Sequence, residues 1–120
     1  MRALLDSLTR PPEDIRAEHL RAWVEKLPGV TPIRDLVERR RFKVAGVIQN
    51  IRIDPRESSG SIEATISDGT GEMVVKWLGR QTMSGIRLGA GLIVEGIVGR
   101  GDGDCPRVLN PEYQLTPAPR

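Results

Sequence analysis

The chain has 120 residues, of which 28 % are charged and 38 % apolar, and a formal net charge of +2 at pH 7. This length suits one globular domain with an extension, and without any run of about 18 apolar residues we expect no membrane-spanning helix. Asp6 and Ser7 interrupt the apolar stretch that a signal peptide would need, and the single cysteine, Cys105, makes neither an internal disulfide nor a zinc site. We therefore expect a cytoplasmic protein.

The small net charge is unevenly distributed. Residues 1–38 carry six basic and seven acidic side chains, whereas residues 39–120 carry twelve and nine. A mildly basic C-terminal part is compatible with a polyanionic partner, and it also occurs in proteins that bind none.

Residues 1–41 are predicted to form an N-terminal helical arm. Pro11-Pro12 suits the first turn of a helix, and Pro28-Gly29 suits its end. Between them runs an apolar stripe at helical spacing, formed by Leu20, Trp23, Val24 and Leu27. We expect this stripe to be buried, either against the rest of the chain or in a homodimer, and exposure would instead favour docking of a protein partner.

A second short helix is predicted after this arm helix. Thr31 is expected to cap it, with Pro32 in the first turn and the apolar residues Ile33, Leu36 and Val37 facing inward. The preceding turn resembles that of a helix-hairpin-helix DNA-binding element. Thr31 stands where that motif has its second glycine, which favours a plain connection between two helices.

Five short segments between Phe42 and Leu115 are predicted to be β-strands. The strongest signal is the turn Ser67-Asp68-Gly69-Thr70-Gly71, because apolar and polar residues alternate on both sides of it. Asp68 is expected to accept hydrogen bonds from backbone N–H groups of this turn, while Gly69 takes a positive φ. The residues of the two flanking strands expected to point outward are Ser61, Glu63, Thr65, Glu72, Val74 and Lys76.

In the first predicted strand, the residues expected to face the core switch from even-numbered to odd-numbered positions. Its apolar residues and glycine fall into two sets, with Phe42, Val44, Gly46 and Ile48 of one parity and Ile51 and Ile53 of the other. If all six residues face the core, a β-bulge near Gln49-Asn50 must insert one extra residue. A long first strand bent in this way allows a five-stranded sheet to close into a barrel.

The last strand, Val108 to Leu115, is predicted to be irregular. Pro111 interrupts it, and proline suits an edge or a bulge better than a central strand. Residues 116–120 are expected to be a disordered tail.

Several motifs resemble those of the OB-fold. They are Val44-Ala45-Gly46-Val47-Ile48, Ser67-Asp68-Gly69-Thr70-Gly71, Trp77-Leu78-Gly79-Arg80, Val94-Glu95-Gly96 and Asn110-Pro111-Glu112-Tyr113. The segment that contains these motifs, Phe42–Leu115, is similar to the wedge OB domain of the bacterial helicase RecG and to small stand-alone bacterial OB-fold proteins. The resemblance implies an all-β fold, in which a five-stranded Greek-key barrel (42–115) follows the α-helical extension, and a nucleic-acid-binding module. The sequence lacks a Gly-rich phosphate loop ending in Lys-Ser/Thr, so no motor is implied.

The candidate nucleic-acid contacts are mostly basic residues near predicted strand ends and loops. The full set is Arg39, Arg40, Arg41, Lys43, Arg52, Arg56, Lys76, Arg80, Arg100, Arg107 and Tyr113. Guanidinium and ammonium groups at these places would attract phosphates independently of base sequence. The run Arg39–Arg41 equally suits a solvated helix end. Two predicted loops carry further arginines: Arg52 and Arg56 lie at or in the loop between the first two strands, and Arg100 and Arg107 flank the loop between the last two. Acidic residues in the same loops weaken their positive field, namely Asp54, Glu57, Asp102 and Asp104.

The outward face of the second and third strands lacks the aromatic residues on which single-strand binders stack bases. Trp77 shares the parity of core residues and is predicted to be buried, whereas Tyr113 either stacks near the rim or caps the core.

The sequence therefore predicts a protein that binds single-stranded or branched nucleic acid, DNA in preference to RNA, with little sequence specificity. The alternative is a protein-interaction or regulatory OB module. We expect no enzyme activity, cofactor, metal or membrane partner, because no catalytic or metal-ligating constellation is recognisable.

Overall fold

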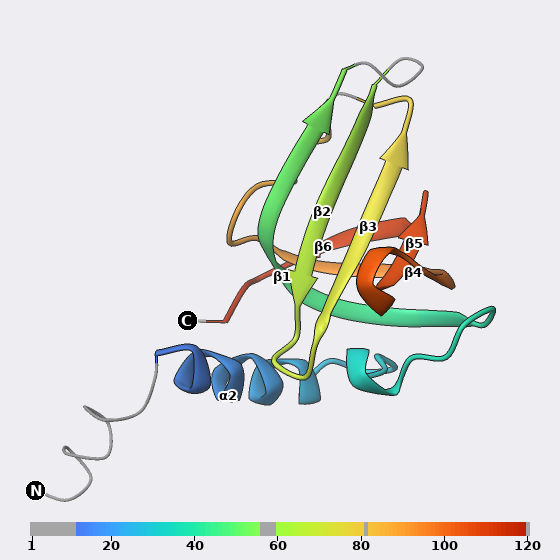
Figure 1. The fold of residues 1–120 in the computed structure, drawn as a ribbon. Coiled ribbons are helices and arrows are strands. Elements are labelled where there is room, and N and C mark those ends of the chain that lie inside the picture. Colours follow the sequence, from blue (N-terminus) through green and yellow to red (C-terminus); the bar gives the residue numbers. More distant parts are fainter. Residues whose placement is uncertain (1–11, 56–59, 81, 120) are drawn as a thin grey trace, which may run out of the picture.

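The computed structural model describes residues 12–55, 60–80 and 82–119 of the chain (Figure 1). One helix packs below a strongly curved β-sheet, and two single-turn 3₁₀ helices lie in the connections. In chain order the elements are α2 (Pro12–Glu25), η1 (Ile33–Asp35), β1 (Arg41–Asp54), β2 (Ser61–Ser67), β3 (Glu72–Leu78), β4 (Gly91–Arg100), η2 (Asp102–Asp104), β5 (Pro106–Leu109) and β6 (Glu112–Thr116).

The strand pairings form a closed circuit. β1 pairs with β2, β2 with β3, β3 with β5, β5 with β4, and β4 again with β1. Only the β3–β5 pairing is parallel. This arrangement confirms the OB-fold predicted from the sequence. The predicted fifth strand is divided, however, because Pro111 separates β5 from β6, and both halves pair with successive parts of β4.

The predicted bulge in the first strand is present. The register of β1 on β2 shifts between Ile48 and Asn50, so Gln49 is the inserted residue. Ile51 consequently turns back toward the core and is half-buried. The expectation that Ile53 also faces the core is wrong, since it is 55 % exposed. Ile53 lies next to the last residue of β1, and Figure 1 shows that the distal ends of β1, β2 and β3 extend beyond β4 and β5.

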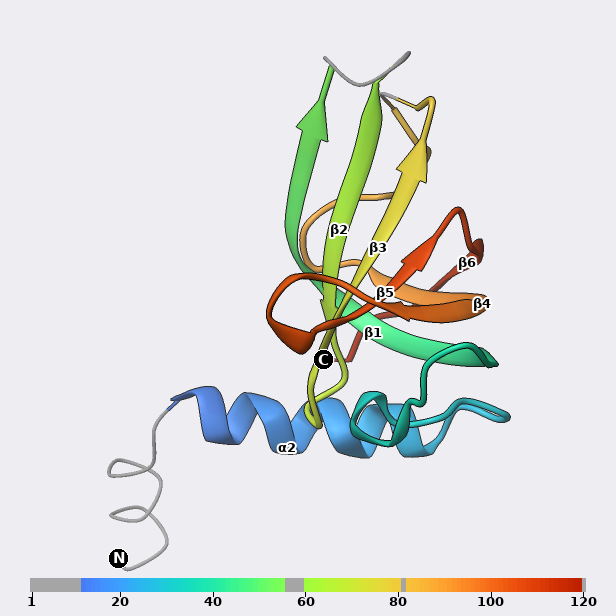
Figure 2. The ribbon, with the colours of Figure 1, turned by 45° about the vertical axis from the view of Figure 1, so that its right-hand side comes forward.

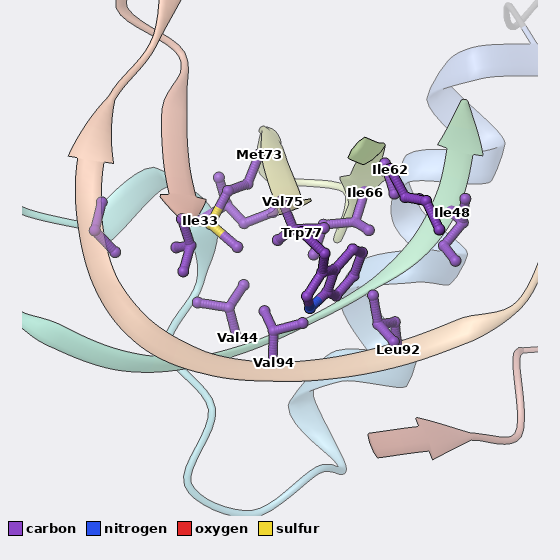
Figure 3. Close-up of a cluster of buried hydrophobic side chains, with 13 residues drawn as sticks. Ile33, Val44, Ile48, Ile62, Ile66, Met73, Val75, Trp77, Leu92 and Val94 are labelled. Carbon is purple, nitrogen blue, oxygen red and sulfur yellow. The ribbon is translucent and has the colours of Figure 1, made fainter. Parts of the chain in front are cut away.

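The core fills the space inside the curved sheet (Figure 3). Trp77 lies at its centre and is 4 % exposed, as its parity predicted. The indole N–H of Trp77 donates a hydrogen bond to the carbonyl of Pro111 at 3.1 Å, and the ring of Tyr113 packs edge-on against it with centroids 5.5 Å apart. Pro111 therefore both breaks the last strand and satisfies the one polar atom of the central core residue.

Helix α2 lies across the end of the β2–β3 hairpin (Figures 1 and 2). Two residues of the predicted stripe, Leu20 and Val24, are buried with 5 % exposure each, and Trp23 and Leu27 are half-buried. The indole N–H of Trp23 donates to the carbonyl of Pro117. The stripe is thus largely covered by the chain itself, as predicted for burial against the barrel.

The contact between α2 and the hairpin is unusually close at Gly69. A Cβ at this position would lie 2.2 Å from the carbonyl oxygen of Ala17, and the φ of Gly69 is +85°. The Arg21 guanidinium donates to the Gly69 carbonyl at 2.9 Å. Glycine therefore serves the turn and the helix packing at once.

The carboxylate of Asp68 organises the same turn, as the sequence predicted. Its Oδ1 accepts hydrogen bonds from the backbone N–H and the hydroxyl of Thr70 and from the N–H of Gly71, at 2.6–3.2 Å. Its Oδ2 accepts a bond from the N–H of Ile33, at 2.8 Å, across 35 residues of sequence. The Asp68 side chain is almost fully buried, with a residue exposure of 1 %.

This last bond corrects the predicted second helix. It is a single 3₁₀ turn, η1, whose N-cap position is occupied by Pro32 without a side-chain hydrogen bond, and not by Thr31. Asp68 and the Thr70 hydroxyl supply the acceptors for the N–H groups of Ile33 and Arg34 instead. Because the helix stops after one turn, Val37 lies 53 % exposed and does not face inward as expected.

No helix within the described residues combines the length and the apolar character needed to cross a membrane.

Substitution of Asp68 should release η1 from the barrel. In Asp68→Asn the Oδ1 acceptor can remain, but the amide NH₂ replaces Oδ2 and opposes the N–H of Ile33. We expect the free energy of unfolding to fall by roughly 2–3 kcal/mol, because two donors then face each other in a buried site. Urea denaturation measures this, and Asp35→Asn at an exposed position of η1 is the matched control. Equal stability of the two variants would contradict the role of Asp68.

Truncation of Trp77 should mainly lower stability. We expect Trp77→Ala to reduce the free energy of unfolding by about 3–5 kcal/mol, since it empties the centre of the core. Thermal and urea denaturation test this, with Trp23→Ala on the half-buried face of α2 as a milder comparison. A Trp77→Ala protein of unchanged stability that lost nucleic-acid binding would instead make Trp77 a stacking residue.

Candidate nucleic-acid interface

An open groove of about 820 Å³ runs over the last part of β4 and the adjoining β5. Four arginines of the predicted set lie along it: Arg39, Arg41, Arg100 and Arg107. They come from the segment before β1, from β1 itself and from the two strands joined by η2. The antiparallel pairing of β1 with β4, and of β4 with β5, brings these distant sequence positions together. We refer to this hollow as the arginine groove.

Glycines and exposed apolar residues form much of the floor of the arginine groove. Gly96 and Gly99 lie on β4, and Gly101 follows it. Ile97 is 62 % exposed and Leu109 is 47 % exposed, and both line the groove. The parity of β4 and β5 explains them, because Val98 and Val108 point into the core.

Arg41 is held by two glutamates. Its Nε donates to Glu95 at 2.9 Å and its Nη2 donates to Glu112 at 3.2 Å. The hydrogen bond to Glu95 raises the pKa of Arg41 further above its usual value. Its positive charge is therefore permanent, but two carboxylates of the groove wall offset it.

Arg100 is held in a comparable way at the other side of the arginine groove. It forms ion pairs with Glu38 and, at 3.0 Å, with Asp104 four residues along the chain. The hydrogen bond to Asp104 is the main cause of the raised pKa of Arg100. Of the two acidic residues expected to weaken the field of the last loop, Asp104 thus does so by pairing with the arginine that precedes the loop.

Arg39 and Arg107 differ from these two. Among the residues that the structure describes, neither has an ion-pair partner. The backbone N–H of Arg39 donates to the carbonyl of Val98 at 2.8 Å, and φ of Arg39 is +69°. Arg107 is half-buried and lies opposite Gly99 in the β4–β5 ladder. These two residues supply the unneutralised charge of the arginine groove.

The remaining candidates lie elsewhere. Arg52 and Lys76 line a very shallow hollow together with Asp54 and Glu63. Lys43 and Tyr113 line another, on β1 and β6. Arg40 is exposed beside the arginine groove, where its carbonyl accepts a bond from Val98, and Arg80 is exposed after β3. Arg56 lies outside the described residues.

The outward face of β2 and β3 is polar apart from Val74 and, at the end of β3, Leu78, which is 47 % exposed. Glu63 stands opposite Lys76 and Thr65 opposite Val74, all four half-buried, and Glu72 is exposed. Ser61 was expected on this face but is 2 % exposed, because its small side chain lies among the longer ones that line the same shallow hollow.

Sequence reasoning did not single out Ile97 or Leu109, and it named Asn110 only as part of an OB-fold motif. Asn110 has φ of +49°; its N–H donates to the Lys76 carbonyl and its Oδ1 accepts from the Leu78 N–H. It thereby fixes the break between β5 and β6, two strands that run in the same direction along β4, beside the arginine groove. Ile97 could have been found from its position in the predicted strand, because it alternates with Gly96 and Val98, which face inward.

Within the described ranges, no group of three or more His, Cys, Asp or Glu side chains is arranged to hold a metal ion.

A family model, tRNA anti-codon, described as "OB-fold nucleic acid binding domain", matches residues 42–117. The chain therefore belongs to the OB-fold nucleic-acid-binding domains. The comparison with curated proteins gives no match.

Among solved structures, one described as "Structure of RecG bound to three-way DNA junction" is similar, with a TM-score of 0.58 and 21 % identity. The match covers 73 % of this chain and 12 % of that protein. It shows the shared fold, and with the family match it confirms the OB-fold that the sequence motifs indicated.

Removal of one wall carboxylate should strengthen polyanion binding. In Glu112→Gln the arginine groove loses one negative charge while Arg41 keeps its bond to Glu95. We expect affinity for a single-stranded oligonucleotide to rise about twofold at low salt, an effect of the size typical of exposed charges. Fluorescence anisotropy measures it. Glu25→Gln on α2 makes the same change of net charge outside the groove, and an equal effect there would show that only net charge matters.

Proposed function

We propose that the chain binds single-stranded or branched nucleic acid through the arginine groove, with DNA favoured over RNA and with little sequence preference. The observation that carries this proposal is the convergence of Arg39, Arg41, Arg100 and Arg107 on one groove of an OB-fold nucleic-acid-binding domain. Guanidinium groups bind phosphate oxygens with paired N–H donors, and such contacts do not depend on the bases.

The expected mode of binding is electrostatic capture of the nucleic-acid backbone. None of the described residues that line the arginine groove is aromatic, so base stacking has no platform there. Ile97 and Leu109 offer apolar contact area between the charged walls. The other predicted contacts, Arg40, Lys43, Arg52, Arg56, Lys76, Arg80 and Tyr113, remain in the proposal as secondary contributors.

The two names found by comparison point to different nucleic acids. The family name refers to tRNA, and the description of the structural match refers to RecG on a three-way DNA junction. The motif likeness to the RecG wedge supports DNA and a branched substrate for this chain. We further propose a cytoplasmic binding module that is not an enzyme and uses no cofactor. This part rests on the sequence.

A protein-interaction module is the second candidate. The exposure of Ile97 and Leu109 within a charged groove favours it, because exposed branched side chains are common anchors of protein contacts.

Anisotropy titrations with single-stranded, duplex and forked DNA, and with single-stranded RNA, at two salt concentrations test the proposal. We expect salt-dependent binding, tightest for the single-stranded or forked DNA. If no oligonucleotide binds, the nucleic-acid function is wrong and the protein-interaction candidate takes its place.

The arginines without acidic partners should contribute most to binding. Arg39→Ala and Arg107→Ala should weaken binding by similar factors on every sequence tested. Each should lower the slope of log K against log salt by about 0.7 on single strands, because one phosphate contact is lost. Arg52→Ala should have a smaller effect, since Asp54 and Glu63 share its hollow.

Arg87→Ala is the matched control for this series, because Arg87 is exposed in the segment before β4 and outside the arginine groove. If Arg87→Ala weakens binding as much as Arg107→Ala does, the groove is not the site.

A further inference from the structure

Four glycines lie within the described strands, and three of them are required by packing. A Cβ would come within 3.0 Å of the Ile66 side chain at Gly46, within 2.5 Å of the Thr116 carbonyl at Gly91, and within 2.7 Å of the Val108 side chain at Gly96. Real Cβ atoms essentially never come as close as those at Gly91 and Gly96 would, and the distance at Gly46 is tighter than nine in ten real contacts, so a larger residue at any of the three positions requires its neighbours to shift.

Gly99 is different. The nearest atom to a Cβ at Gly99 would be the carbonyl oxygen of Arg107 at 3.6 Å, an ordinary van der Waals distance. Its φ is not positive, so the backbone conformation does not require glycine either. Glycine in a strand is destabilising relative to alanine, because it loses more conformational freedom on folding. The fold therefore accepts a cost at Gly99 that its own packing does not explain.

The surroundings of Gly99 indicate what the missing side chain leaves room for. Gly99 is exposed on the floor of the arginine groove. Arg107 faces it across the β4–β5 ladder, Arg100 follows it, and Arg39 donates its backbone N–H to the preceding residue, Val98. The three arginines thus line the same groove as this bare stretch of backbone, an arrangement that lets the backbone of a ligand approach closely.

We infer that Gly99 is a ligand-contact position at which the sugar-phosphate backbone of the bound strand lies directly on β4. This inference deepens the proposed function and rests on it. Glycine at this point admits the strand close enough for Arg39 and Arg107 to reach its phosphates, and a side chain there would hold the strand away from them.

The experiment fills the floor of the groove without removing any charge. Gly99→Ala and Gly99→Val are compared with the unmodified chain for binding of a single-stranded oligonucleotide. We expect a moderate loss of affinity for alanine and a loss of at least about tenfold for valine, as for other steric misfits in a binding site. The salt slope should stay close to that of the unmodified chain, because the cations remain. Thermal stability should not fall in Gly99→Ala, whereas Gly96→Ala should lower it clearly.

Thr65→Leu is the control for bulk on the sheet surface. Thr65 lies on the outward face of β2, separated from Arg107 by Val74 of β3. If Thr65→Leu weakens binding and the Gly99 variants do not, the strand lies across β2 and β3, and the inference is wrong. Full affinity of Gly99→Val also overturns it while the proposed function stands.

Should Gly99→Val fail to fold, the Gly99→Ala variant decides, with loss of affinity at unchanged melting temperature as the supporting result and unchanged affinity as the contrary one. If the unmodified chain binds no oligonucleotide, the inference falls together with the proposed function.

Discussion

The buried carboxylate of Asp68 connects the parts of this molecule that its sequence keeps far apart. One oxygen closes the β2–β3 turn, and the other holds the first N–H of η1, which leads to β1. The same turn supports α2 through the Gly69 backbone. From η1 the chain passes Glu38, the partner of Arg100, and reaches Arg39, whose N–H binds Val98. The wall of the arginine groove is therefore connected, through η1, to the hydrogen bond between the Ile33 N–H and the Asp68 carboxylate. This bond is strong because the carboxylate is buried.

Most of the fold was predictable because it depends on local patterns with strong physical reasons. Alternation around the Asp68-Gly69 turn defines β2 and β3, and the change of parity between Ile48 and Ile51 predicts the bulge that bends β1. What the sequence did not reveal depends on distant partners. The cap of η1 comes from Asp68 and not from Thr31, and the exposure of Ile53 follows from how far β4 and β5 reach. Neither is encoded within a window of neighbouring residues.

The candidate site was predictable as a set of residue types but not as an arrangement. The arginines were evident, and four of them meet in one groove. Their differences were not evident, because the acidic partners of Arg41 lie 54 and 71 residues away in sequence. Counting charges by loop assigned Asp104 a general weakening effect, whereas the structure shows it bound to Arg100. A list of basic residues therefore overstates the charge available to a ligand.

The division between paired and unpaired arginines bears on how a weakly charged OB-fold can bind a polyanion. A groove lined by four unopposed guanidinium groups would repel itself, and its side chains would spread into solvent. The glutamates that hold Arg41 reduce this repulsion and fix the geometry of the wall, but they also lower the positive electrostatic potential of the groove. In the binding mode that we propose, the bare backbone at Gly99 offsets this loss, because Coulomb attraction grows as the phosphate comes nearer. Close approach can thus replace excess charge, which agrees with a net charge of only +2.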